Sequence, residues 1–177
     1  HVPQTARELL GMRLCRRHPD GSVSRHTIRE TEAYDGMGDK ACHAHRGVTN
    51  RTSVMFGPPG YWYVYLCYGV HWMLNLVARE RDYPAAILIR GAGDVSGPGR
   101  LTKALAIDGT LNRTRQRRES GLWIEEGEPV PEEAVLRTPR IGIHYAGPEW
   151  SQAPYRFVIA PDPLAPVTPP ARKFDTA

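Results

Sequence analysis

The strongest constraint on the fold comes from residues 61–77, where two alternating segments flank a Tyr-Gly pair. The first segment, Tyr61–Cys67, is rich in aromatic residues, and the second, Val70–Val77, sorts its side chains into two distinct faces. A period of two is typical of β-strands, and a glycine between two such segments suits a tight turn. We therefore predict a β-hairpin with Tyr68 at its tip.

The other segments predict further short strands and few helices. Strands are expected on both sides of the turn residues His18–Ser22 and at 27–34, 85–90, 122–124, 140–144 and 155–159. Helices are expected at 5–14, with Thr5 as N-cap, and at 100–107 after a glycine-rich entry. This pattern predicts an α+β fold: a single domain over 1–160, with a curved, mainly antiparallel sheet, a protruding β-hairpin and peripheral helices. A proline-rich, irregular tail is expected at 161–177.

Segment 27–34 combines carboxylates with an aromatic side chain. Read as a strand, it places on one face Ile28, Glu30, Glu32 and Tyr34. A glutamate in such a place is either a general base or a solvated, salt-bridged residue, and the segment alone leaves both open. The polar stretch that follows, 35–53, is too irregular for a helix and too long for a simple turn. Long loops of this kind are often functional.

Composition excludes several classes of protein. With 41% hydrophobic and 24% charged residues and no long apolar run, the 177-residue chain does not read as a membrane protein. The first residues lack the features of a secretory signal, so we expect an intracellular location. The three cysteines show no CxxC spacing, and GxGxxG, Walker A and GxSxG motifs are absent. The net charge of +4 suits a polyanionic partner without demanding one.

Three features allow more than one function. An aromatic residue on a tight turn, such as Tyr68, suits either a wedge between stacked bases or a ring folded back on a neighbouring loop. The thiol and imidazoles of Cys42, His43 and His45 suit a small metal site, although no further Cys or His pair completes it. The basic cluster at 113–118 suits phosphate contacts or a solvated surface. An enzyme, a non-catalytic nucleic-acid-binding module and a small metalloprotein all stay open at this point.

Several motifs follow one another between about residues 6 and 157. They are Glu30-Thr31-Glu32-Ala33-Tyr34, His43, Thr49-Asn50-Arg51, Met55–Gly60, Tyr63-Val64-Tyr65, Tyr68-Gly69, Asn75, Leu88-Ile89-Arg90, Gly97–Leu101, Ala104–Ile107 and Arg140–Ile143. In order and spacing they resemble the alkyladenine DNA glycosylase family, the mammalian-type 3-methyladenine DNA glycosylases. The resemblance implies base-excision repair: a damaged purine is flipped out of the duplex and its N-glycosidic bond is hydrolysed.

The resemblance also implies a role for each matching residue. Glu32 is the expected general base, and Arg90 and the backbone carbonyl of Ile141 are expected to help hold the water that it activates. The remaining implied roles are base binding by Tyr34, His43, Tyr65 and Asn75, DNA intercalation by Tyr68, and DNA-backbone contact by Thr49, Arg51, Gly99 and Arg100. We expect no metal and no cofactor, a double-stranded DNA partner that contains damaged purines, and a monomeric protein.

The chain departs from this family between Arg90 and the Gly97-Pro98-Gly99 segment. Relatives usually carry a longer, partly helical insertion there, whereas only 91–96 fill the interval in this sequence. DNA contacts from that insertion therefore cannot be assigned. The family's basic residue after the glycine-rich segment is Arg100, which provides the charge of a lysine with a different geometry.

Overall fold

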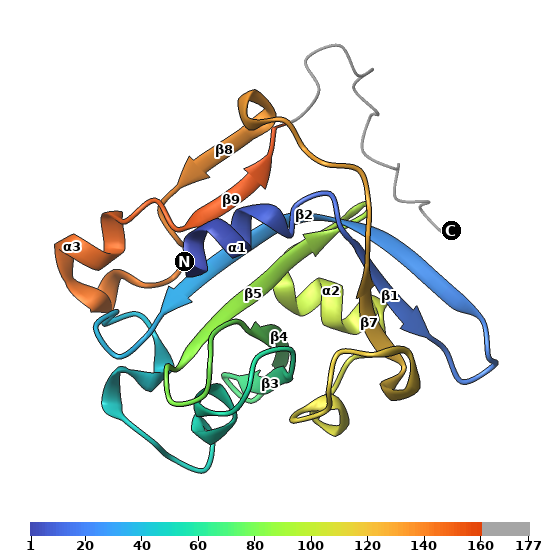
Figure 1. Cartoon of the computed structure of the whole chain (residues 1–177), viewed down its shortest axis with the longest axis horizontal. Coiled ribbons are helices and arrows are strands. Elements are labelled where there is room, and N and C mark those ends of the chain that lie inside the picture. The colour runs from blue at the N-terminus through green and yellow to red at the C-terminus, as the bar shows by residue number, and fades with distance from the viewer. Residues whose placement is uncertain (161–177) are drawn as a thin grey trace, which may run out of the picture.

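Strand β2 (Val23–Asp35) is a long central strand of the sheet in this computed structural model, which describes residues 1–160 (Figure 1). Its first half pairs with β1 (Arg13–Arg17) across the predicted turn at His18–Ser22. Its second half pairs with β5 (Ala85–Ala92) on one edge and with β9 (Arg156–Ile159) on the other. A long strand that changes partners along its length bends the sheet, and the fold is the predicted α+β domain with a curved antiparallel sheet.

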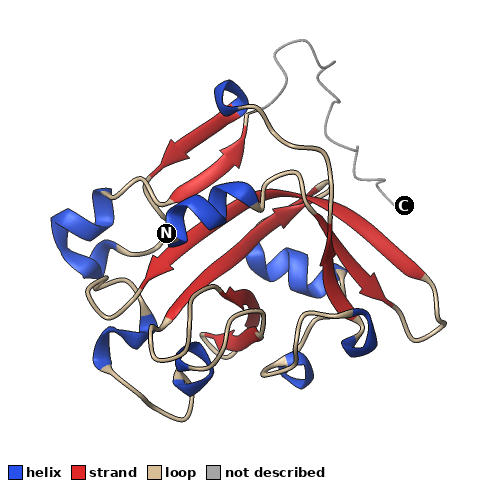
Figure 2. Cartoon of the chain, viewed as in Figure 1, coloured by secondary structure: helices blue, strands red, loops and turns tan. Residues whose placement is uncertain are grey.

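The remaining elements complete this sheet and cover it (Figure 2). The α-helices are α1 (Val2–Glu8), α2 (Pro98–Ala104) and α3 (Gly147–Gln152). The other strands are β3 (Trp62–Cys67), β4 (His71–Val77), β6 (Val95–Ser96), β7 (Leu122–Glu125) and β8 (Val135–Thr138). Short 3-10 helices are η1 (His43–Arg46), η2 (Ser53–Phe56), η3 (Gly109–Leu111), η4 (Arg118–Ser120), η5 (Glu132–Ala134) and η6 (His144–Ala146). The predicted tail at 161–177 lies outside the described residues.

The predicted hairpin at 61–77 is confirmed. Strands β3 and β4 pair in antiparallel fashion from Trp62 opposite Leu76 to Cys67 opposite His71. This hairpin forms one edge of the main sheet path, β3-β4-β5-β2-β1-β7, in which all neighbouring strands are antiparallel. The hairpin tip therefore projects from a strand pair that the rest of the sheet supports on one side only.

Strand β5 contributes side chains to both faces of the sheet. Its Ile87 and Ile89 belong to the main apolar core, which also contains side chains of α1 and α2. Its Leu88 and Arg90 point to the opposite face, where they line a cavity. We call this second side the cavity face. Because strand side chains alternate, one buried strand supplies both the core and the site.

Three local predictions are wrong. The first helix spans Val2–Glu8 instead of 5–14, so Thr5 lies inside it, and residues from Arg13 onward form β1. The segment 140–144 forms no strand but a bend that leads into η6. Ile28 does not share a face with Glu30, because register shifts on both sides of Glu30 place Ile28 in the main apolar core. A β-bulge of this kind re-aims the side chains that follow it.

In the short segment 91–96 the chain makes a tight turn and runs back along the end of β5. Strand β6 pairs directly with the end of β5, with Gly91 opposite Ser96 and Ala92 opposite Val95. The glycine-rich segment Gly97-Pro98-Gly99 follows and leads into α2, so residues 91–96 are enough to connect β5 to this helix. None of the helices over 1–160 is long and apolar enough to cross a membrane.

Candidate active site

A cavity of about 960 Å³ opens on the cavity face of the sheet. Its walls come from β3, β4 and β5, from the long loop after β2 and from the segment after β8. The predicted site residues that line it are Tyr34, His43, Thr49, Arg51, Tyr65, Tyr68, Asn75, Arg90 and Ile141. Its size is in the range of small-molecule binding pockets.

Glu32 lies behind the wall of this cavity and is fully buried. Its Oε1 accepts a 2.8 Å hydrogen bond from the backbone N–H of Ile141, and its Oε2 accepts a 2.9 Å hydrogen bond from the hydroxyl of Tyr34. Nη1 of Arg90 lies 3.4 Å from Oε1. The structure thus gathers the three residues predicted as catalytic, Glu32, Arg90 and Ile141, into one cluster at the edge of the cavity.

The acidity of Glu32 is set by opposing influences. Burial raises its pKa above the ordinary value of 4.5, and it outweighs the charge of Arg90 and the hydrogen bonds from Ile141 and Tyr34, which lower the pKa. A carboxyl group with a raised pKa is a better proton acceptor when it is ionised, and its pKa lies closer to neutral pH. These are the properties that a general base needs.

Arg90 is held in place by a second carboxylate, that of Glu30. Nε of Arg90 and Nε of Arg156 each donate a 2.7 Å hydrogen bond to Oε1 of Glu30. Although burial raises the pKa of Glu30, the hydrogen bonds from Arg156 and Arg90 bring it below its ordinary value, so Glu30 is ionised. Two carboxyl groups and two guanidinium groups therefore form one network, which fixes the guanidinium of Arg90 beside Glu32.

His43 is a neutral hydrogen-bonding group in the cavity wall. Its Nδ1 lies 2.9 Å from the hydroxyl of Tyr63, and its ring meets that of Tyr65 edge-on at a centroid distance of 4.7 Å. Burial, together with the charge of Arg51, lowers the pKa of His43 to about 4. A neutral imidazole carries one N–H donor, so His43 can offer a hydrogen bond at neutral pH but is not a reservoir of protons.

Arg51 lies against the aromatic wall of the cavity. Its Cζ is 4.5 Å from the centroid of the Tyr65 ring, a distance at which a guanidinium and an aromatic face attract each other. The side chain is exposed, as is that of Thr49, which exchanges hydrogen bonds with Thr52. Thr49 and Arg51, predicted to contact the DNA backbone, therefore lie at the cavity itself.

Asn75 occupies the cavity wall on β4, where it is 3% exposed. Its Nδ2 donates to the backbone carbonyls of Tyr63 at 3.1 Å and Met73 at 3.4 Å. These bonds fix the amide within the β3–β4 hairpin. Asn75 is thus a buried part of the cavity wall whose amide is held by two backbone carbonyls.

Tyr68 projects from the tip of the hairpin. Its side chain is 94% exposed, so the alternative of a ring folded back on a neighbouring loop is wrong. Its φ of 50° and the φ of 69° at Gly69 place both residues in the left-handed region, which is uncommon for a tyrosine. Because two consecutive left-handed residues make the turn tight, the ring is presented at the rim of the cavity and not absorbed by the core.

Gly99 and Arg100 lie apart from the main cavity. Together with His71 they line a smaller one of about 360 Å³ between β4 and α2. A Cβ atom at Gly99 would lie 2.9 Å from the His71 ring, so only glycine allows α2 to approach the hairpin this closely. The structure therefore separates these two predicted backbone contacts from Thr49 and Arg51.

The three residues of the metal hypothesis do not converge. Cys42 is buried, with its Sγ 3.9 Å from the carbonyl of Pro84, whereas Nδ1 of His45 lies 2.7 Å from the carbonyl of Met37. His43 faces Tyr63 instead. Within residues 1–160, no group of three His, Cys, Asp or Glu side chains is arranged to hold a metal ion.

Sequence reasoning missed the residues that support the cluster. The supporting residues are Glu30, Asp39, Arg140 and Arg156. Arg90 and Arg156 lie 60 and 126 residues from Glu30, and Asp39 lies 101 residues from Arg140. Charged residues so far apart give no local pattern. Glu30 and Arg140 belong to motifs quoted above, but those motifs did not indicate their partners.

Known proteins resemble this chain along most of its length. The family model described as "Methylpurine-DNA glycosylase (MPG)" matches residues 1–95 and 93–163, and the two matches meet at the β5–β6 return. A relative from Methanocella arvoryzae is 41% identical over 174 residues, which cover 87% of this chain and 85% of the relative. A relative from Anaeromyxobacter dehalogenans strain 2CP-C is 44% identical over 162 residues, which cover 87% and 76%.

A third relative, from Chlorobaculum parvum, is 38% identical over 179 residues, which cover 90% of this chain and 83% of the relative. All three relatives carry the name "Putative 3-methyladenine DNA glycosylase". The chain belongs to the methylpurine-DNA glycosylase family.

Proposed function

We propose that this protein removes alkylated or deaminated purines from double-stranded DNA by flipping the damaged nucleotide and hydrolysing its N-glycosidic bond. The observation that carries the proposal is the exposed ring of Tyr68 on the rim of the same cavity behind which Glu32 is buried. A wedge and a water-activating carboxylate serve different steps of one reaction. Their placement at one cavity is what such an enzyme requires.

Flipping is needed because a purine inside the duplex leaves no room for water to reach C1′. Extrusion of a nucleotide costs a few kcal/mol, least where the base is damaged or poorly paired. In our proposal Tyr68 fills the vacated stack and offsets part of this cost. Base–aromatic stacking is typically worth ~1–3 kcal/mol per base. The left-handed turn presents the ring before DNA arrives, so little ordering is needed on binding.

The flipped base would enter between the aromatic walls of the cavity. Tyr34 and Tyr65 both line it, and electron-rich rings attract a purine made cationic by alkylation at N3 or N7. Neutral lesions such as hypoxanthine need a hydrogen bond to the leaving base instead. If the hydroxyl of Tyr63 donates to Nδ1 of His43, the Nε2 proton of His43 is free for this purpose. Asn75 would crowd the exocyclic amino group of an undamaged guanine.

Hydrolysis would follow at the opposite end of the flipped nucleotide. Departure of the base leaves positive charge on the sugar, which the ionised Glu32 stabilises while it accepts a proton from the attacking water. Arg90 favours the ionised form of Glu32. The family resemblance implies that the carbonyl of Ile141 helps hold this water, while the N–H of the same residue binds Glu32. Direct attack by water requires no metal in this scheme.

The experiment that tests the function measures base release. The protein is incubated with four duplexes, each of which contains 3-methyladenine, 7-methylguanine, hypoxanthine or ethenoadenine, and the freed base is quantified. We expect release from at least one lesion duplex and none from an undamaged duplex. Binding to all four duplexes without any release would contradict the proposal and identify a non-catalytic DNA-binding protein.

A further inference from the structure

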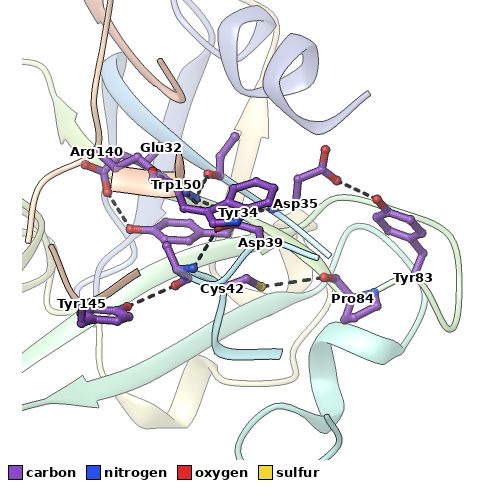
Figure 3. Close-up of polar contacts among 12 residues, drawn as sticks. Glu32, Tyr34, Asp35, Asp39, Cys42, Tyr83, Pro84, Arg140, Tyr145 and Trp150 are labelled. Carbon is purple, nitrogen blue, oxygen red and sulfur yellow. Dashed lines mark hydrogen bonds and ion pairs between the residues drawn. The ribbon is translucent and has the colours of Figure 1, made fainter. Parts of the chain in front are cut away.

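Asp39 and Arg140 form an ion pair in which both side chains have no exposed surface. Nη2 of Arg140 donates a 2.9 Å hydrogen bond to Oδ1 of Asp39, and Nη1 lies against Oδ2. Figure 3 shows this pair in the same region as Glu32 and Tyr34, which come from β2. Neither charged residue lines the cavity, so the pair is not a part of the base-binding wall.

The pair ties together the backbone segments that carry the site. Nη1 of Arg140 also donates a 2.8 Å hydrogen bond to the carbonyl of Ala33, the residue between Glu32 and Tyr34. The carboxylate of Asp39 accepts hydrogen bonds from the backbone N–H groups of Asp35 at 3.1 Å and Ala41 at 2.9 Å. One ion pair thus connects β2, the loop that leads to His43 and the segment that precedes Ile141.

Arg140 has two further contacts with the catalytic cluster. Its Cζ lies 4.8 Å from the centroid of the Tyr34 ring, which it therefore supports from beneath the cavity wall. The next residue along the chain is Ile141, whose N–H binds Glu32 at 2.8 Å. A displacement of Arg140 would move both hydrogen-bond donors that bind the Glu32 carboxylate, the Tyr34 hydroxyl and the Ile141 N–H.

Stability alone does not account for a pair of this kind. Removing two charges from water carries a desolvation cost that often exceeds the attraction between them, and apolar residues of similar volume are often as stabilising or more so. Arg140 Nε is moreover buried without a hydrogen-bond partner in the part of the chain that the structure describes. What an apolar pair cannot reproduce is the directed set of bonds to Ala33, Asp35 and Ala41.

We propose that Asp39 and Arg140 are a positioning pair, which holds the Tyr34 hydroxyl and the Ile141 N–H where they bind the carboxylate of Glu32 for the hydrolytic step. This inference rests on the proposed function. Asp39 and Arg140 act by positioning other residues and not by binding the substrate. The pair sets where the general base points. It has no contact of its own with the base or the sugar.

The test replaces the ion pair by an apolar pair in the double variant Asp39→Leu/Arg140→Met. Single-turnover excision of hypoxanthine is measured over a range of enzyme concentrations, which separates the maximal rate from the concentration at half-saturation, and the melting temperature is recorded. We expect a lower melting temperature, because the Ala33 carbonyl and the N–H groups of Asp35 and Ala41 lose their partners. In the folded variant we expect nearly unchanged half-saturation and a maximal rate lower by about 10²-fold, the loss typical of a small misplacement. A folded double variant with the parental maximal rate would overturn the proposal.

Arg140→Lys decides the question if the double variant does not fold. Lysine keeps the charge opposite Asp39 but lacks the planar fork that reaches Asp39 and Ala33 together. We expect this variant to fold and to lose maximal rate at unchanged half-saturation. Parental rate in a folded Arg140→Lys protein would overturn the proposal, as would a change confined to half-saturation.

The matched control is Arg25→Gln/Glu125→Gln, which removes the ion pairs that Glu125 of β7 forms with Arg25 of β2 at 3.0 Å and with Arg118 at 2.6 Å, all at exposed or partly exposed side chains. We expect its rate and half-saturation to equal those of the parent. The parental protein distinguishes the two possible failures. If the parent releases no base, the proposed function itself is wrong. If the parent is active and either folded Arg140 variant releases base at the parental rate, only the positioning role is wrong.

Discussion

The backbone N–H of Ile141 binds the carboxylate of Glu32 across 109 residues of sequence, at 2.8 Å. The loop after β8 thereby reaches the second half of β2 and orients the group proposed as general base. The resemblance to the glycosylase family implied a role for the carbonyl of Ile141, and the structure adds a role for its N–H. The same residue can thus hold the base with one group and the water with the other.

The dependence of excision on pH should report Glu32. Because burial raises the pKa of Glu32 and only the ionised form accepts a proton, the single-turnover rate should rise with pH through a midpoint above 4.5. His43, with a pKa of about 4, is already neutral in that range. Excision of hypoxanthine measured as a function of pH checks this. A His43→Gln variant should show a lower rate with the same midpoint, whereas a shifted midpoint would assign the titration to His43.

Replacing Tyr68 by serine should slow excision from paired DNA. The exposed ring at the hairpin tip would no longer fill the stack, and base–aromatic stacking is worth ~1–3 kcal/mol. The loss should be smaller for a lesion placed in a single-nucleotide bulge, where the base is already unstacked. Excision from the two duplexes is compared for parent and variant.

Val70→Ser is the matched control for this substitution, because Val70 is another exposed apolar side chain of the same hairpin, at 69%, and does not line the main cavity. We expect a smaller effect from it. Equal losses on paired and bulged lesions for Tyr68→Ser would show that the ring supports the fold of the hairpin and is not a wedge.

Chelators should leave the activity unchanged. The proposed chemistry uses a carboxylate, a guanidinium, aromatic rings and water, and the thiol of Cys42 and the ring of His45 face different partners. Purified protein is treated with a strong chelator, its metal content is measured, and excision is assayed before and after treatment. Stoichiometric zinc together with activity that chelation removes and zinc restores would contradict this prediction.

Local chemistry explains which parts of the fold were predictable from the sequence. The hairpin around Tyr68 and the turn at His18–Ser22 are encoded by neighbouring residues, namely alternating strands and turn formers. No strand forms at 140–144. Arg140 instead forms a buried ion pair with Asp39, a contact that no local sequence pattern predicts. The face assigned to Ile28 failed because a bulge at Glu30 interrupts the alternation.

The candidate site divides in the same way. Glu32, Tyr34 and Arg90 were found through motifs, and the structure brings them together. Their supports were not found, because Glu30 and Arg156 have meaning only once β2 and β9 are paired, Glu32 opposite Arg156. Residues that touch a substrate can be recognised from a family pattern. Residues that orient them depend on contacts between distant segments.

The substitution Glu32→Gln tests the central claim most directly. Glutamine keeps the shape of the side chain and can still accept a hydrogen bond from Ile141, but it can neither accept a proton from water nor offset the positive charge of the sugar. Single-turnover excision of hypoxanthine is measured beside the affinity for the same duplex, since a neutral leaving group departs least by itself. We predict near-parental binding and a rate lower by at least about 10²–10⁴-fold. Normal binding with the parental rate of hypoxanthine release would show that Glu32 is not the general base.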